Sequence, residues 1–420
     1  MHTIHRLQGP PASIGPPAGL RHCAMGAAAA AALVLMLPLG LAPSVFSSGI
    51  GGFPCVRVPA LLAIPDGPLL AFAECRSFIG DGCEPKTPGN IHSSTAVENI
   101  TNNVKDRVVC MRSSSDAGVT WGPLMANISR GQACYPTAVF EPRTKSVLLH
   151  FSAWPGDEPS SHVNYYNPSP MQVVSTDNGK TFGVPELVFP MEAKNPPSLF
   201  LGSCRGTVVK QGPHAGRVLF AGYNHSLPKD TESNTFVWYS DDMGRAGSWL
   251  RSSTDIMDMA EPQITTMPAT GEVALFGRSN GEMGCKCQNT ARSTNGGTSW
   301  SQARNLTSLP SPGCQGSVLM QTGSDGILGY YSGPDSSTSR VNMTVWVTKD
   351  PAARVWEPAH RVASVPSQSG SYSCIEDLSV LSSSSSTAGV LWETTLPKGD
   401  SATEVECEGG GCNIVFTSVF

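Results

Sequence analysis

Short apolar runs separated by turn residues dominate this chain. Residues 146–151, 217–223, 273–277 and 317–321 have the length and composition of β-strands, and clusters rich in Gly, Pro, Asn and Asp separate such runs. No long stretch shows the 3.6-residue periodicity of an amphipathic helix. The pattern therefore predicts an all-β protein.

The first predicted hairpin carries two arginines. Arg57 lies in Val-Arg-Val-Pro (residues 56–59), Arg76 ends the apolar run 69–76, and a Pro-Asp-Gly turn lies between the runs. Asp81 follows shortly after. Taken singly, an arginine before proline is usually a surface residue, and an aspartate before glycine usually forms a turn. Because a hairpin can hold side chains from both strands over one spot, the group together suggests an anionic substrate and a proton donor.

A short segment recurs along the chain. Four copies begin at residues 114, 175, 240 and 293 and share Ser, then Asp or Asn, Gly and an aromatic residue. The third copy has a two-residue insertion, the fourth has Asn for Asp, and a fifth, degenerate copy spans residues 348–356. In such a segment Asp or Asn bonds to nearby backbone, Gly supplies the positive φ that closes a turn, and the aromatic residue packs the turn down.

The spacing of the copies indicates the architecture. Their central positions 116, 177, 242, 295 and 350 are 61, 65, 53 and 55 residues apart. Each interval can hold a four-stranded sheet, which is one blade of a β-propeller, and the remaining chain accommodates about six of them. The predicted fold is a six-bladed β-propeller with repeated turns, occupying residues 53–420.

The first 46 residues have a different character. Arg6, Arg21 and His22 precede an apolar stretch at residues 27–37 that continues through residues 41–45. A positive flank before an apolar core predicts a secretory signal peptide, or a signal anchor that stays uncleaved in a membrane. A buried helix is the alternative, but polar turn residues follow at once. We assign residues 1–46 to the signal segment.

Charge and cysteine content narrow the class of protein. The net charge is −5 and the 28 basic residues form no cluster, which argues against a nucleic-acid partner. Of 13 cysteines, 12 follow the signal segment, an even number that suits disulfides in the secretory pathway. We expect Cys285 and Cys287 to pair elsewhere rather than with each other, because they are so close. A zinc site is the weaker alternative, since no histidine spacing accompanies them.

Five Asn-x-Ser/Thr sequons agree with a secretory route. The predicted glycosylation sites are Asn99, Asn127, Asn224, Asn305 and Asn342.

The repeated segments resemble the Asp boxes of sialidases, which are six-bladed propellers, although other secreted propellers such as sorting receptors carry them too. Arg57-Val58-Pro59 resembles the Arg-Ile-Pro motif of sialidases, and residues 69–76 resemble their strand ending in Ala-Glu-x-Arg. Residues 313–318 (Gly-Cys-Gln-Gly-Ser-Val) resemble a segment familiar in animal sialidases. The likeness is closest to the lysosomal sialidases of animals and covers residues 53–420. Val56 departs from the pattern, since an aromatic residue usually precedes the first arginine.

The resemblance implies a role for each motif residue. Asp81 is implied as the acid/base, Tyr372 as the nucleophile and Glu261 as the base that activates Tyr372. The residues implied to bind the substrate carboxylate are Arg57, Arg278 and Arg340, and those implied to support them are Arg76 and Glu393. No metal or cofactor is implied.

The chemistry of sialic acid explains this set of residue types. The sugar carries a carboxylate on its anomeric carbon, and three guanidinium groups can hold that anion through directional, charge-assisted hydrogen bonds. A carboxylate nucleophile would be repelled by the substrate's own charge, whereas a tyrosine hydroxyl is not. Because free tyrosine titrates near 10, it needs a base within reach, and we expect the nearby arginines to favour the phenolate as well.

The function predicted is a retaining exo-sialidase that releases terminal sialic acid from glycoproteins, oligosaccharides or glycolipids, gangliosides included. Two alternatives are a non-catalytic glycan-binding or sorting propeller, which would need neither Tyr372 nor Glu261, and a trans-sialidase. The expected location is the lysosome or a membrane, with secretion open. Dependence on a protective carboxypeptidase partner cannot be inferred.

Overall fold

The computed structural model describes residues 44–78, 83, 107–153, 168–188, 198–225, 233–279, 285–321, 323, 326–364, 368–395 and 413–420. The chain divides into two compact units, Met1–Gly40 and Leu41–Phe420, and all of these ranges lie in the second. The predicted acid/base Asp81, the sequon at Asn99 and nearly all of the signal segment lie outside the described residues.

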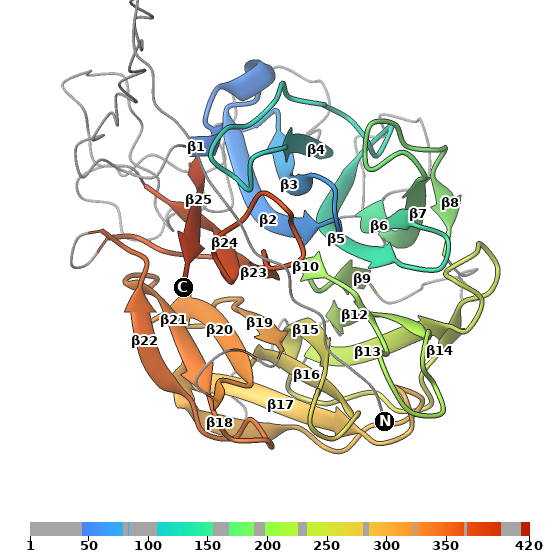
Figure 1. The fold of residues 1–420 in the computed structure, drawn as a ribbon, viewed down its shortest axis with the longest axis vertical. Helices are drawn as coiled ribbons and strands as arrows, with labels where there is room; N and C mark the ends of the chain where they lie inside the picture. Colours follow the sequence, from blue (N-terminus) through green and yellow to red (C-terminus); the bar gives the residue numbers. More distant parts are fainter. Residues whose placement is uncertain are drawn as a thin grey trace, which may run out of the picture. The chain divides into compact units, whose positions relative to one another are not determined.

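Six sheets of the described residues follow one another around a common axis (Figure 1). Blade 1 contains β2 (Cys55–Ala63), β3 (Leu69–Arg76) and β4 (Arg107–Ser114). Blade 2 contains β5 (Ala133–Glu141), β6 (Ser146–Ala153), β7 (Ser169–Ser175) and β8 (Glu186–Leu187), and β10 (Cys204–Arg205) pairs in parallel with β5. Blade 3 contains β12 (Val218–His225), β13 (Ser233–Ser240) and β14 (Leu250–Arg251), with β9 (Ser198–Leu201) and β11 (Thr207–Val208) both paired along β12.

The other three blades have four strands each. Blade 4 contains β15 (Ala260–Thr266), β16 (Val273–Arg278), β17 (Cys287–Ser293) and β18 (Arg304–Pro310). Blade 5 contains β19 (Ser317–Met320), β20 (Gly329–Pro334), β21 (Met343–Thr348) and β22 (Glu357–Arg361). Blade 6 contains β23 (Ser373–Asp377), β24 (Ala388–Thr394), β25 (Asn413–Val419) and β1 (Ser44–Ser47). The prediction of an all-β, six-bladed propeller is confirmed.

Blade 6 joins the two ends of the propeller. Its outermost strand β1 pairs antiparallel with β25, placing Phe46 beside Ile414. The short 3-10 helix η1 (Ile50–Gly52) then leads into blade 1. Ser44–Ser47 therefore belongs to the propeller, although it precedes the predicted boundary at residue 53, and part of the apolar stretch assigned to the signal segment is the outer strand of blade 6.

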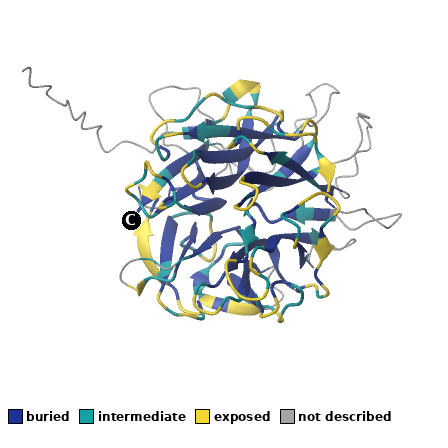
Figure 2. Cartoon of the chain, turned by 45° about the vertical axis from the view of Figure 1, so that its right-hand side comes forward, coloured by how far each residue is buried: buried dark blue, intermediate teal, exposed yellow. Residues whose placement is uncertain are grey.

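One buried apolar cluster fills each gap between neighbouring blades. Between blades 2 and 3, for example, Leu148 packs with Phe220 and Trp238, and between blades 4 and 5, Phe276 packs with Trp346 and Trp356. Figure 2 shows that the strands are largely buried, while exposed residues gather in turns and outer strands. Apolar burial between blades therefore holds the ring together.

The repeated segments are turns of one geometry. In the first, the Ser114 hydroxyl donates to Asp116 (2.7 Å) and accepts from Gly118 N (2.8 Å), while Asp116 accepts from the backbone and hydroxyl of Thr120. The fifth copy keeps this pattern: Asp350 accepts from Ala352 N and Arg354 N. Ala353, with φ of 48°, takes the place of the glycine there.

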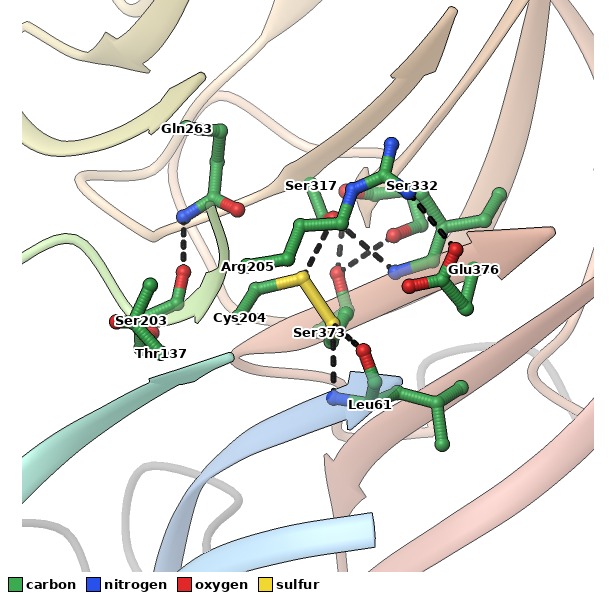
Figure 3. The surroundings of a disulfide bond; sticks show 12 residues. Leu61, Thr137, Ser203, Cys204, Arg205, Gln263, Ser317, Ser332, Ser373 and Glu376 are labelled. Atoms are coloured by element: carbon green, nitrogen blue, oxygen red, sulfur yellow. Dashed lines mark hydrogen bonds and ion pairs between the residues drawn. A yellow bond between two sulfur atoms is a disulfide. The ribbon is translucent and has the colours of Figure 1, made fainter. Parts of the chain in front are cut away.

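The axis of the propeller is crossed by a disulfide between Cys204 and Cys374, which are 170 residues apart in sequence and fully buried (Figure 3). Cys374 Sγ accepts from Leu61 N (3.2 Å), and Cys204 Sγ lies 3.2 Å from the Ser317 hydroxyl. The disulfide thus contacts strands that belong to blades 1, 2, 5 and 6.

Three other disulfides are described. Cys55 pairs with Cys83, Cys75 with Cys110, and Cys285 with Cys287. The expectation that Cys285 and Cys287 pair elsewhere is wrong. The chain bends before β17, so their Cα atoms are only 5.2 Å apart, within the range that a disulfide spans.

Candidate active site

Tyr372 lies immediately before β23 and is almost completely buried, with 6 % of its surface exposed. Its hydroxyl donates to Glu261 Oε1 on β15. The other carboxylate oxygen, Oε2, accepts from Nε of Arg278 at 2.6 Å. Blades 4 and 6, whose sequences are far apart, therefore meet at one tyrosine–carboxylate–guanidinium group.

Glu393, on β24 of blade 6, fixes Arg57 next to Tyr372. Glu393 Oε1 accepts from Arg57 Nε at 2.8 Å and from Val58 N at 2.7 Å, and its Oε2 accepts from Tyr372 N at 3.2 Å. Glu393 is fully buried, and Arg57 is 4 % exposed. The Arg57 guanidinium lies over the Tyr372 ring, 5.2 Å from its centroid. One carboxylate therefore fixes both an arginine and the backbone of Tyr372.

Arg340 approaches the same ring, 5.4 Å from its centroid. Its Nη2 donates to Gly313 O at 3.0 Å and its Nη1 to the Ser371 hydroxyl at 3.3 Å. Cys314, a fully buried thiol, packs against Val58 and Tyr372 beneath this group. Gly313 therefore helps to fix the guanidinium group of Arg340.

The pKa of Tyr372 is raised, whereas the nearby arginines alone are expected to favour the phenolate. Burial and the neighbouring Glu261 raise the pKa of Tyr372 well above its usual value of 10, although Arg278 and Arg340 act in the opposite direction. For Arg278, burial acts to lower the pKa, but Glu261 and the surrounding tyrosines raise it on balance. Tyr372 is therefore a neutral phenol beside an ionised arginine, because burial outweighs the effect of the cations.

Three site residues share the same unusual backbone conformation. Val58, Tyr135 and Glu261 have positive φ values of 56°, 55° and 49°, and each precedes a proline. Each lies where the first strand of its blade has one more residue than its partner, which is a β-bulge. The bulges reset the register so that side chains at the start of each strand point toward the site.

Two residues of the site, Glu74 and Tyr135, have no role assigned from the sequence, although Glu74 lies in the Ala-Glu-x-Arg segment at the end of β3. Glu74 accepts from Arg76 and from Tyr135 N, and the Tyr223 hydroxyl donates to the Tyr135 hydroxyl at 3.0 Å. A glutamate inside the apolar run 69–75 is a signal that could have identified Glu74. Nothing in the sequence around Tyr135 marks it, since its place depends on the bulge.

The BNR repeat-like domain family matches residues 106–379, more than half of the chain. A sialidase of Micromonospora viridifaciens is 27 % identical over 345 residues, covering 74 % of this chain and 47 % of its own length. Human Sialidase-4 (Homo sapiens) is 26 % identical over 289 residues, covering 63 % and 54 %. The chain belongs to the sialidase family of BNR-repeat proteins.

Solved structures of the sialidase family share the fold. A Hadza microbial sialidase has a TM-score of 0.63 at 18 % identity, covering 90 % of this chain and 68 % of its own. A leech intramolecular trans-sialidase has a TM-score of 0.63 at 17 % identity, covering 90 % and 70 %. This chain spans about half the length of the curated sialidase relatives that it matches.

The structure brings together six of the residues that the sequence analysis singles out: Arg57, Glu261, Arg278, Arg340, Tyr372 and Glu393. Arg76 lies on the same hairpin as Arg57 but is bound by Glu74. The likeness to lysosomal sialidases and the roles of the site residues, that of Asp81 included, stay predictions.

Of the sequons within the described ranges, Asn127 and Asn305 are exposed, whereas Asn224 and Asn342 are half-buried. The ranges that the structure describes contain no cluster of three or more metal-ligating side chains. They also contain no helix with the length and apolar character of a membrane span.

Proposed function

We propose that this chain is a retaining exo-sialidase that hydrolyses terminal sialic acid from glycoproteins, oligosaccharides and glycolipids. The observation that supports this most strongly is the hydrogen bond from the Tyr372 hydroxyl to Glu261. Arg57 and Arg340 flank the ring of Tyr372, and Arg278 binds the same carboxylate. A glycan-binding module would need the arginines but not this activated phenol.

Substrate binding would rest on the three arginines. Arg57 and Arg278 each use Nε for a glutamate, so their terminal amino groups face other partners, and Arg340 is supported by Gly313 O. Planar guanidinium groups in fixed orientations suit the two oxygens of one carboxylate. The sugar's anomeric carbon would then lie close to the Tyr372 oxygen.

The covalent step would use Tyr372 and Glu261 as a pair. Because the pKa of Tyr372 is raised, the phenol keeps its proton until substrate binds. The Tyr372 oxygen attacks the anomeric carbon while Glu261 takes the phenolic proton and the glycosidic C–O bond breaks. Asp81 would protonate the departing oxygen and later activate the water that hydrolyses the glycosyl–tyrosine bond, which regenerates Tyr372.

Replacing the nucleophile tests this proposal. We expect Tyr372→Phe to lower kcat by roughly three orders of magnitude or more on a fluorogenic sialoside assayed across pH, because no covalent intermediate can form. The measurement is the release of the fluorophore by purified wild type and variant. Tyr330→Phe is the matched control, since Tyr330 is an equally buried tyrosine in the cluster between blades 5 and 6.

Unchanged turnover by Tyr372→Phe, or loss of turnover in Tyr330→Phe alone, would contradict the assignment. Wild type that binds sialosides without turning them over would instead be a glycan-binding propeller. Product analysis separates the remaining alternative, since transfer of the sialyl group to an added sugar would indicate a trans-sialidase.

We place the protein in the secretory pathway, with the lysosome or a membrane as its destination and secretion as the alternative. The exposure of Asn127 and Asn305 supports glycosylation at those two sequons. A mass shift on glycosidase treatment of the purified protein would test both modifications.

A further inference from the structure

Glu74 is a fully buried carboxylate at the centre of blade 1. It lies on β3, opposite Arg57 on β2 and opposite Val109 on β4. Neither the substrate-binding arginines nor the Tyr372–Glu261 pair binds it in the mechanism above. A carboxylate that is kept out of water is costly unless several partners compensate it.

The partners of Glu74 come from three strands and two blades. Its Oε2 accepts from Arg76 Nε at 2.9 Å and from Arg76 Nη2 at 2.7 Å, and Arg107 Nη1 on β4 lies 3.9 Å away. Its Oε1 accepts from Tyr135 N on β5 at 2.9 Å. The guanidinium groups of Arg76 and Arg107 both lie over the ring of Phe78. One anion therefore holds two cations and the bulge of the neighbouring blade.

That bulge forms part of the wall beside the nucleophile. Tyr135 packs against the cluster of Val58, Cys314 and Tyr372. Its hydroxyl accepts from Tyr223, whose pKa is raised by burial and further by Glu261 and Tyr372, so the pair lies close to the reacting groups. Because Tyr135 has a positive φ, its backbone needs a fixed partner to stay in that conformation.

We propose that Glu74 is a positioning residue for the reaction: it fixes Arg76 and Arg107 on one side and the Tyr135 bulge on the other, and so keeps the surroundings of Tyr372 in shape. The inference rests on the proposed sialidase activity. The substrate-binding arginines do not depend on Glu74, since Arg57 is held by Glu393 and Arg278 by Glu261. Losing Glu74 should therefore affect turnover more than binding.

The test compares Glu74→Gln with Glu141→Gln. Glu141 is an equally buried carboxylate that binds Arg143 Nε at 2.7 Å and Thr144 N at 2.7 Å, at the far end of β5. We expect Glu74→Gln to lower kcat on the order of a hundredfold with KM changed only a few-fold, because a small displacement in an active site costs about that much. Glu141→Gln should keep the wild-type kcat and KM.

Glu74→Asp serves as a second variant. Its carboxylate is one methylene shorter and cannot hold both Arg76 and Tyr135 N, so we expect a kcat between those of wild type and Glu74→Gln. A wild-type kcat in Glu74→Asp, or equal constants for Glu74→Gln and Glu141→Gln, would overturn the positioning role while leaving the sialidase assignment intact.

Wild type without activity would refute the proposed function; the structural part of the inference, that Glu74 fixes Arg76, has its own readout. That readout is the Nε–H signal of Arg76 in a ¹⁵N spectrum, which is assigned by its disappearance in Arg76→Lys. Loss of its protection from solvent exchange in Glu74→Gln supports the role, and an unchanged signal overturns it.

Discussion

Glu261 accepts hydrogen bonds at both carboxylate oxygens, one from the phenol of Tyr372 and one from Arg278. The two donors fix the orientation of the carboxylate, so that the oxygen facing Tyr372 cannot rotate away. Since the pKa of Tyr372 is raised by burial, the nucleophile is stored as a neutral phenol. If Tyr372 were instead a phenolate, its negative charge would repel the carboxylate of the arriving substrate.

His150 is a second buried group whose protonation is fixed by its neighbours. Its Nδ1 accepts from Trp238 Nε1 at 3.2 Å, so the proton must reside on Nε2, which donates to Gln172 Oε1 at 2.8 Å. The ring also stacks on Phe220, with centroids 3.8 Å apart. Burial lowers the pKa of His150 from its usual 6.5 to about 3, despite the bond to Gln172.

This histidine should make stability fall in acid. The unfolded chain binds the proton below pH 6.5 whereas the folded protein does not until about pH 3, so stability is complete above 6.5 and decreases as pH falls. We expect His150 to contribute about 1.4 kcal/mol of lost unfolding free energy for each pH unit in this window. Urea unfolding of wild type and His150→Phe at pH 7.5 and 4.5 measures it, and equal pH slopes would contradict it.

Most of the site could be predicted residue by residue, because the arginines, Tyr372, Glu261 and Glu393 lie in short motifs. Glu74 has a single local signal, a glutamate inside an apolar run, and Tyr135 has none, since the contact between them depends on how blades 1 and 2 pack together. The positive φ of Tyr135 arises at a bulge, and proline at the next position does not by itself reveal which face the side chain takes.

At the scale of the elements, the repeated turns do more than close hairpins. The glycine of each turn packs against a side chain of the preceding blade: Gly118 against Phe416, Gly179 against Leu70, Gly244 against Leu148 and Gly297 against Leu219. A side chain there would occupy the space of that neighbour. Each repeat therefore joins its blade to the one before it, which explains why the glycine recurs.

A comparison of Gly179 with Gly212 should separate the cost of the steric clash with Leu70 from the cost of a positive φ. Gly179 has φ of 83°, and an added Cβ would lie 2.6 Å from Leu70 Cδ1. Gly212 has φ of 82° with no atom within 4 Å of such a Cβ. We expect Gly212→Ala to cost about 1–2 kcal/mol of unfolding free energy from φ alone, and Gly179→Ala to cost more. Urea titrations measure both, and equal losses would contradict the inter-blade contact.

The repeats predicted the blades well because each encodes a local turn. The pairing of β10 with β5, which interrupts the inner edge of blade 3, could not be predicted from local pattern. Nor could the place of Ser44–Ser47, since these residues continue the apolar stretch at residues 27–45 without a local feature that marks them as a strand.

At the scale of the whole molecule, the Cys204–Cys374 disulfide joins blades 2 and 6, whose cysteines are far apart in sequence. It closes a loop of 170 residues, whereas Cys285–Cys287 spans a sequence separation of only 2. Cross-linking distant residues removes more freedom from the unfolded chain than cross-linking close ones. The axial disulfide should therefore contribute far more to stability.

We expect replacement of Cys204 and Cys374 by alanine to lower the unfolding free energy by about 5 kcal/mol, and the same change at Cys285 and Cys287 to lower it by about 1 kcal/mol. Urea unfolding of both double variants gives the comparison. A larger loss for the Cys285–Cys287 pair would show that loop closure does not govern these disulfides.

The pairing of β1 with β25 also orders events during synthesis. Residues 44–47 leave the ribosome long before residues 413–419, so blade 6 cannot be completed until residues 413–419 have emerged. Blades 2, 4 and 5 draw their main strands from contiguous sequence and can pair earlier. Until β25 is made, β1 has no partner strand and the apolar surface of blade 1 that packs on blade 6 stays uncovered, so the nascent chain is most prone to aggregation at that stage.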